Sequence, residues 1–123
     1  MPPAPKPIRH DATKEVQISV VSRSPHVVAY RLWFKRPGDA AWTRIGDGTT
    51  ADDVPDSVTS GPFPDGTLIA YWLGIGGNAN TKYRTLVIFS QEGNVLPGGT
   101  CIEEDKVDAD GLAVVEGYVE LTS

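Results

Sequence analysis

Trp33 is the residue whose type and neighbours are best suited to recognising a ligand. It lies between Arg31 and Lys35, each two positions away, so in an extended strand the three side chains project from one face. An aromatic ring flanked by cations can stack on a sugar ring, on another planar group or on a second subunit. We therefore take Trp33, Arg31 and Lys35 as candidate ligand-binding residues. Cover of the Trp33 ring by a loop of the same chain is the alternative.

Trp42, Asn78 and Asn80 complete the candidate binding set. The two asparagines fall in the segment 74–81, whose amide and hydroxyl groups suit a ligand rich in hydroxyls. A simple hairpin connection is the alternative interpretation of that segment. Trp42, like Trp72, also suits packing in the core or across a hairpin. Together the six residues predict recognition of a carbohydrate or another small polar ligand.

Signatures of catalysis are absent from the sequence. It contains no Gly-x-Ser-x-Gly elbow, no His-Glu-x-x-His and no phosphate-binding Gly-x-x-x-x-Gly-Lys, and its two histidines are too few for a triad or a zinc site. The single cysteine, Cys101, suits the role of a small, partly buried hydrophobic residue. We expect a protein that is not an enzyme and that needs no cofactor.

Two acidic segments could offer oxygen ligands to calcium. The segment 103–111 carries five carboxylates in nine residues, but only 108–111 matches part of the helix-loop-helix calcium motif. A solvated hairpin turn, with Asp110-Gly111 as its tight pair, is the simpler interpretation. The segment 47–56 is interpreted in the same way, and we predict no metal site.

Charge is distributed unevenly along the chain. Residues 1–45 carry eight basic and three acidic residues (net +5), whereas 46–123 carry three basic and 13 acidic residues (net −10), which gives −5 overall. An acidic protein is a poor ligand for phosphate backbones, so nucleic acid is not expected as a partner. Either the two halves interleave and neutralise each other locally, or basic and acidic faces attract each other between copies and form a homo-oligomer.

The chain of 123 residues is long enough for one domain. Residues 1–14 are expected to form a proline-rich N-terminal arm, since four of the first seven residues are proline. Residues 15–123 are expected to form the domain itself. No segment shows the 3.6-residue period of an amphipathic helix over three turns.

Short strand-like segments separated by turn residues fill the rest of the chain. They lie at 16–20, 27–36, 42–45, 67–75, 83–89, 100–103 and 112–121, with weaker segments at 57–60 and 95–96. In 27–36 one face carries only apolar residues, namely Val28, Tyr30, Leu32 and Phe34, and we predict that it points into the core. Seven to nine such strands with little or no helix predict an all-β fold, a single antiparallel β-sandwich.

The stretch 30–44, YRLWFKRPGDAAWTR, resembles the C-to-C′ hairpin of fibronectin type III and related immunoglobulin-like domains. The stretch 65–71, followed by Gly76-Gly77 and Tyr83, is similar to strand F, the following loop and strand G of that fold. The resemblance covers about 27–89, with at least two additional strands after Phe89. It implies an immunoglobulin-like architecture and no activity, since this fold hosts many functions.

We expect a non-catalytic binding module. The alternative is a structural or assembly protein that self-associates through its sheet surface and N-terminal arm. No apolar run approaches the roughly 20 residues of a membrane span, and the first residues do not resemble a secretory signal. With one cysteine and no disulfide pair, a cytoplasmic setting is the default expectation, and leaderless export stays open.

Overall fold

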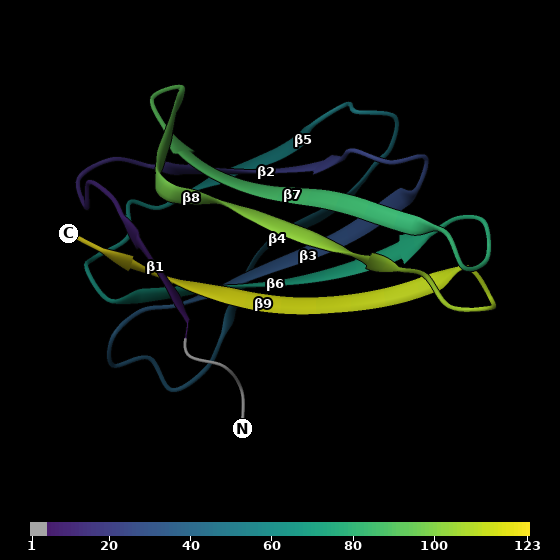
Figure 1. The fold of residues 1–123 in the computed structure, drawn as a ribbon. Helices are drawn as coiled ribbons and strands as arrows, with labels where there is room; N and C mark the ends of the chain where they lie inside the picture. The colour runs from purple at the N-terminus through teal and green to yellow at the C-terminus, as the bar shows by residue number, and fades with distance from the viewer. Residues whose placement is uncertain (1–4) are drawn as a thin grey trace.

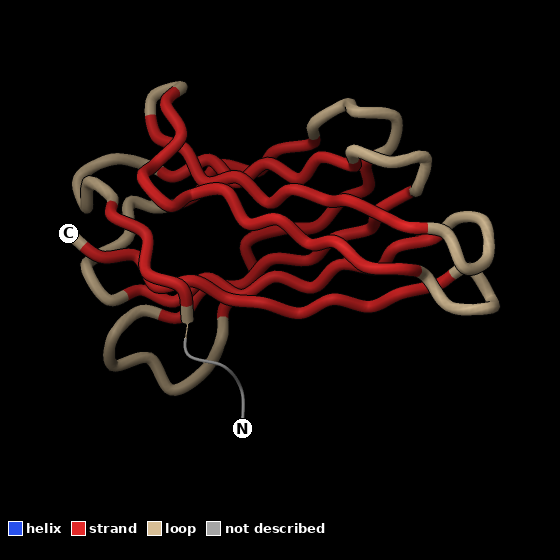
Figure 2. Tube along the Cα trace, in the orientation of Figure 1, coloured by secondary structure: helices blue, strands red, loops and turns tan. Residues whose placement is uncertain are grey.

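The computed structural model describes residues 5–123, which form nine strands and no helix (Figures 1 and 2). The strands are β1 (Lys6–Arg9), β2 (Val16–Ser22), β3 (Val27–Lys35), β4 (Thr43–Thr50), β5 (Asp56–Ser60), β6 (Thr67–Gly76), β7 (Lys82–Gln91), β8 (Asn94–Lys106) and β9 (Leu112–Thr122). Five of them form sheet A, in the order β1-β9-β6-β3-β4, and four form sheet B, in the order β5-β2-β7-β8. The predicted all-β sandwich is confirmed.

The core lies between the two sheets and is filled by every second residue of the central strands. In β3 the buried residues are Val28, Tyr30, Leu32 and Phe34, which confirms the predicted core face. In β6 they are Ile69, Tyr71, Leu73 and Ile75. Sheet B contributes residues such as Ile18, Val87 and Phe89, all without exposed surface. Burial of each such side chain contributes about 1.5–3 kcal/mol, so the core fixes which face of each strand points outward.

The hairpin predicted across the Pro37-Gly38 turn is present, since β3 pairs antiparallel with β4. The hairpin implied between 67–75 and 83–89 is wrong, because β6 lies in sheet A and β7 in sheet B. The place beside β6 is taken by β9. The acidic segment 103–111, predicted to be a hairpin turn, instead contains the end of β8 and the connection from sheet B to sheet A.

The two connections that cross between the sheets at one end hold each other in place. Gly77 N–H donates to the Gly111 carbonyl, Asn80 N–H to the Asp108 carbonyl and Val107 N–H to the Thr81 carbonyl, each at 3.0 Å. The two loops lie side by side at the right of Figure 1. These hydrogen bonds satisfy backbone groups that a hairpin would have paired within one sheet.

Residues 5–14, the described part of the expected N-terminal arm, lie against the sandwich and not apart from it. Residues 1–4 fall outside the described residues, but β1 pairs in parallel with β9, which also departs from a purely antiparallel fold. Pro7 is tolerated because β1 is an edge strand, where a missing N–H leaves no ladder bond unmade. Ile8 has 0 % of its surface exposed. Its side chain therefore anchors the segment in the core.

Two tyrosine hydroxyls connect the sheets on opposite sides of the sandwich. Tyr30 in β3 donates to the Asp56 carboxylate at the start of β5, and Tyr71 in β6 donates to Glu103 Oε2 in β8 at 2.6 Å. Burial, followed by the hydrogen bond to the carboxylate, raises the pKa of both phenols. Each buried hydroxyl is thereby satisfied, and each edge strand of sheet B is tied to a central strand of sheet A.

We expect Ile8→Ala to lower the free energy of unfolding by about 2–5 kcal/mol, because it leaves a cavity under β1. Chemical denaturation measures this loss, with Arg9→Ala as the control because that side chain is exposed. A loss below about 0.5 kcal/mol would contradict the docking of β1.

The raised pKa values of Tyr30 and Tyr71 predict a loss of stability at alkaline pH. An unfolded tyrosine ionises near pH 10, so the stability that comes from the neutral phenols is complete below that pH and is lost as pH rises toward the higher folded-state values. Urea denaturation between pH 8 and 11 should show a shallower loss for Tyr71→Phe than for the unchanged protein. Tyr118→Phe is the matched control, and equal slopes for Tyr71→Phe and the unchanged protein would refute the prediction.

Candidate functional site

The outer face of sheet A carries a cluster of aromatic side chains that the core does not use. Because Tyr30, Leu32 and Phe34 point inward, Trp33 projects to the other side of β3, where it is partly exposed. The same alternation places Trp72 of β6 and Tyr118 of β9 on that outer face. Cross-strand pairing then sets which of these side chains are neighbours.

Three cross-strand rows span β3, β6 and β9 at this face. The middle row is Trp33, Ala70 and Tyr118, the row on one side of it is Arg31, Trp72 and Glu116, and the row on the other side is Lys35, Leu68 and Glu120. Ala70 is the smallest side chain at the centre, flanked by an aromatic residue on each neighbouring strand. The register therefore leaves a depression above Ala70.

This depression, here called the aromatic hollow, has a volume of about 420 Å³. Its lining residues are Trp33, Ala70, Tyr71, Trp72, Glu116, Gly117 and Tyr118. A smaller hollow of about 240 Å³ adjoins it between Trp33, Trp42 and Ala70. Trp42, which precedes β4 and is 43 % exposed, is brought to Trp33 by the β3–β4 hairpin. The hollow thus has aromatic walls, one carboxylate and one phenol, a lining typical of small-ligand sites.

Trp72 lies on this outer face and not in the core or across a hairpin, where it had been expected. The Arg31 guanidinium carbon lies 5.0 Å from the centroid of its ring, a cation–π arrangement. The far edge of the indole lies against Gly74, where a Cβ atom would come within 2.6 Å of the ring. Glycine at this position therefore allows the indole to lie along the strand.

Of the six predicted binding residues, Arg31, Trp33, Lys35 and Trp42 share the outer face of sheet A or its margin. Asn78 and Asn80 lie in the loop after Gly76, the last residue of β6. Gly76 is six residues from Ala70, a distance of about 20 Å at the rise of a strand. The structure does not bring these asparagines together with Trp33.

The loop that carries Asn78 and Asn80 is held by a buried histidine. His26 Nε2 lies 2.8 Å from Thr81 Oγ1, and that hydroxyl donates to the Asn78 carbonyl at 2.6 Å. Because the hydroxyl proton is used in that second bond, the His26 Nε2–H is the donor to Thr81. These hydrogen bonds hold the loop against the β2–β3 connection, so the segment 74–81 is an ordered part of that end of the sandwich.

Sequence reasoning missed Trp72, Tyr118 and Glu116 as members of the site. For Tyr118 the signal was available, since Val119 and Leu121 alternate with it and are buried. For Trp72 it was not, because residues 68–73 are apolar at every position. Only the placement of β6 within sheet A shows which of its faces points outward.

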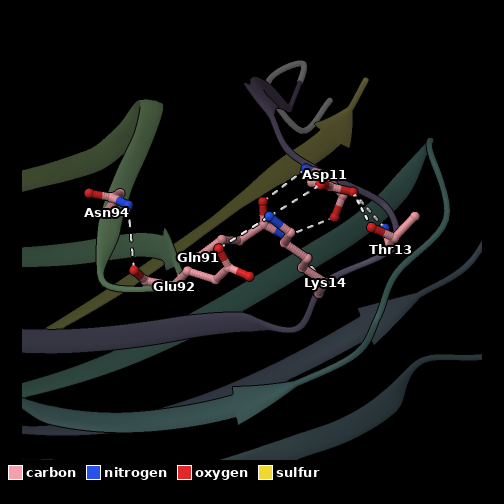
Figure 3. Close-up of polar contacts among 6 residues, drawn as sticks. All are labelled: Asp11, Thr13, Lys14, Gln91, Glu92 and Asn94. Carbon is pink, nitrogen blue, oxygen red and sulfur yellow. Dashed lines mark hydrogen bonds and ion pairs between the residues drawn. The ribbon is translucent and has the colours of Figure 1, made fainter.

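A larger hollow of about 790 Å³ lies over the outer face of sheet B, between residues such as Lys14, Gln17, Thr59 and Glu92. Figure 3 shows the polar contacts beside it. The Lys14 ammonium lies 3.2 Å from Glu92 Oε2 and 3.7 Å from Asp11 Oδ2. Glu92 raises the pKa of Lys14, and the hydroxyl and N–H of Thr13 lower the pKa of Asp11. These charges are already satisfied within the chain.

The side chain of Gln91 explains why this second region is structural. Its amide oxygen accepts from the Asp11 N–H at 2.8 Å, and its amide nitrogen donates to the carbonyls of Asp11 at 2.8 Å and Lys14 at 3.1 Å. Gln91 is buried, so it fastens the turn between β1 and β2 to the end of β7. The hollow beside it has no aromatic wall, and the aromatic hollow remains the better candidate site.

Over residues 5–123, no group of three or more His, Cys, Asp or Glu side chains is placed to hold a metal ion. Cys101 is buried, and burial raises the pKa of its thiol. In the same part of the chain, no helix is long and apolar enough to cross a membrane. Comparison with protein-family models, curated proteins and solved structures finds no match.

We expect Trp33→Ala to lower the free energy of unfolding by about 1–2 kcal/mol, because the ring is only partly buried and lies outside the core. Phe89→Ala should cost about 3–5 kcal/mol, since Phe89 lies in the core. Chemical denaturation of the two variants makes the comparison. A loss for Trp33→Ala as large as that for Phe89→Ala would contradict the assignment of Trp33 to the outer face.

Proposed function

We propose that this chain is a non-catalytic binding module whose ligand, a carbohydrate or another small polar molecule, enters the aromatic hollow. The observation that carries the proposal is the middle row, where Trp33 and Tyr118 stand on either side of Ala70. Two strand spacings separate β3 from β9, about 9.6 Å. A ring that stacks between two aromatic side chains needs roughly 7 Å, so one ring fits above the Ala70 methyl group.

The polar groups of the hollow suit the rim of a sugar. Glu116 offers carboxylate oxygens to hydroxyl donors, and the phenol of Tyr118 can both donate and accept. Arg31 stacks on Trp72. It shares a cross-strand row with Glu116, which lies two strands away on β9. Aromatic walls with a few polar groups provide apolar contact and orientation together.

An immunoglobulin-like architecture is part of the proposal. The pairing of β3 with both β4 and β6 supports it, whereas the place of β7 in the opposite sheet departs from the expected strand G. A cytoplasmic setting also stays a prediction, supported by the single free cysteine, which is buried.

Titration of tryptophan fluorescence with soluble hexasaccharides of β-1,4-linked glucose, α-1,4-linked glucose and β-1,4-linked N-acetylglucosamine tests the binding proposal. We expect a saturable change with at least one of them. Trp33→Ala should weaken that binding by about 2 kcal/mol, roughly 30-fold, because interface aromatics concentrate binding energy. Ala70→Leu should abolish it by filling the hollow.

Ala109→Leu is the matched control, since Ala109 lies exposed in the loop between β8 and β9. It adds the same three carbon atoms away from sheet A. No response to any of the three hexasaccharides, or binding that Ala70→Leu leaves unchanged, would refute this function.

A further inference from the structure

On β3, β6 and β9 the outward charges of sheet A are sorted by strand, and β4 adds the ion pair Arg44–Asp47 opposite Trp33 and Arg31. β3 contributes the basic residues Arg31 and Lys35, and β9 contributes the acidic residues Glu116 and Glu120. β6 lies between them, at the centre of the five-stranded sheet. Arg31 shares a row with Glu116, and Lys35 shares a row with Glu120. The face therefore has a basic side and an acidic side in matching register.

These four charges have no partner of opposite sign within residues 5–123. The ion pairs of that part of the chain join Lys14 to Asp11 and Glu92, and link Arg23–Asp53, Arg84–Glu104 and, on β4 of the same face, Arg44–Asp47. None of them includes Arg31, Lys35, Glu116 or Glu120. The outer face of sheet A thus presents complementary charges that residues 5–123 leave unpaired.

We propose that two copies of the chain pack these faces together about a twofold axis that runs along β6. Such a rotation places β3 of one copy over β9 of the other and keeps every row at its own level. Arg31 then faces Glu116 of the second copy, and Lys35 faces Glu120 of the second copy. Each contact occurs twice because the interface is isologous.

The apolar residues obey the same symmetry. Trp33 faces Tyr118 of the second copy, and Trp72 of each copy lies near the axis. Farther along the strands, Val27 and Leu112 share another cross-strand row, and they are 55 % and 59 % exposed. They therefore also face each other between copies. Val114, 64 % exposed, lies beside them. On β3, β6 and β9, apolar surface therefore meets apolar surface in these uncharged rows.

The charge pattern disfavours a twofold axis that runs across the strands. An axis across the strands, through the middle row, would place Arg31 over Lys35 of the second copy and Glu116 over Glu120. Like charges brought together in this way cost several kcal/mol. Of these two axes, the one along β6 brings opposite charges together, so the charge pattern favours that orientation.

The face has the size of a small interface. Four strands at about 4.8 Å spacing, β9, β6, β3 and β4, and eight residue steps at about 3.3 Å give roughly 19 by 26 Å, about 500 Å² for each copy. The total of about 1,000 Å² is typical of weak, transient association. We therefore expect a weak and reversible dimer.

The dimer would cover the aromatic hollow, which lies at the centre of the same face. Self-association and ligand binding are then alternative states of one surface, and a ligand that fills the hollow shifts the chain toward the monomer. This consequence rests on the proposed function, but the dimer itself does not.

Sedimentation equilibrium of charge-reversal variants tests the dimer. Arg31→Glu alone places two pairs of like charges in the interface, and so does Glu116→Arg alone, so each variant should dimerise at least tenfold more weakly than the unchanged chain. A mixture of the two variants restores both pairs of opposite charge, and it should form a heterodimer about as tight as the original dimer. Glu15→Arg is the matched control, because it reverses an exposed charge immediately before β2, which belongs to sheet B.

An unchanged chain that stays monomeric up to 1 mM would overturn the proposal. So would single variants that dimerise like the unchanged chain, or a mixture that fails to recover association. The hexasaccharide titration is a separate measurement. A dimer with no response to the sugars would refute the binding function alone, and sugar binding by a strict monomer would refute the dimer alone.

Discussion

The strict alternation of side chains along β3 and β6 is the constraint on which the candidate site depends. These neighbouring strands occupy the middle of sheet A, and their inward residues supply much of the core. Once Tyr30 and Tyr71 point inward, Trp33 and Trp72 must point outward. A slip of one residue would move the aromatic face into the core and the core into water. The burial free energy of the core therefore also holds the site in its geometry.

Exposing the aromatic side chains of the outer face of sheet A to water costs free energy, which supports a binding role for this face. Neither a helix nor a third layer of described residues covers it, and large exposed apolar patches are uncommon on monomeric proteins. Small residues at Ala70 and Gly74 create space among the aromatic side chains where larger residues would have closed it. A ligand ring and a second copy of the chain would both use this surface, because each removes the same apolar area from water.

How much of this could be predicted differs from one strand to the next. In 27–36 apolar and mixed faces are distinct, so the inward face and the outward position of Trp33 followed from the pattern. In 67–75 both faces are apolar, so the pattern could not place Trp72. Asn78 and Asn80 looked suited to a ligand by residue type, but the loop that holds them belongs to the end of the sandwich. Residue type indicates which chemistry is available, whereas strand pairing decides which groups meet.

The sequence by itself determined an all-β sandwich and the buried face of its clearest strand, because turn residues and period-two alternation act over a few neighbouring positions. The tertiary structure decided that β7 crosses to sheet B, that Ile8 docks β1 beside β9, and that Tyr118 stands opposite Ala70. Lys6 and Val119 are partners although 113 positions separate them. Such pairings depend on hydrogen bonds and buried faces shared by distant strands, and a local pattern cannot specify which distant strand will provide them.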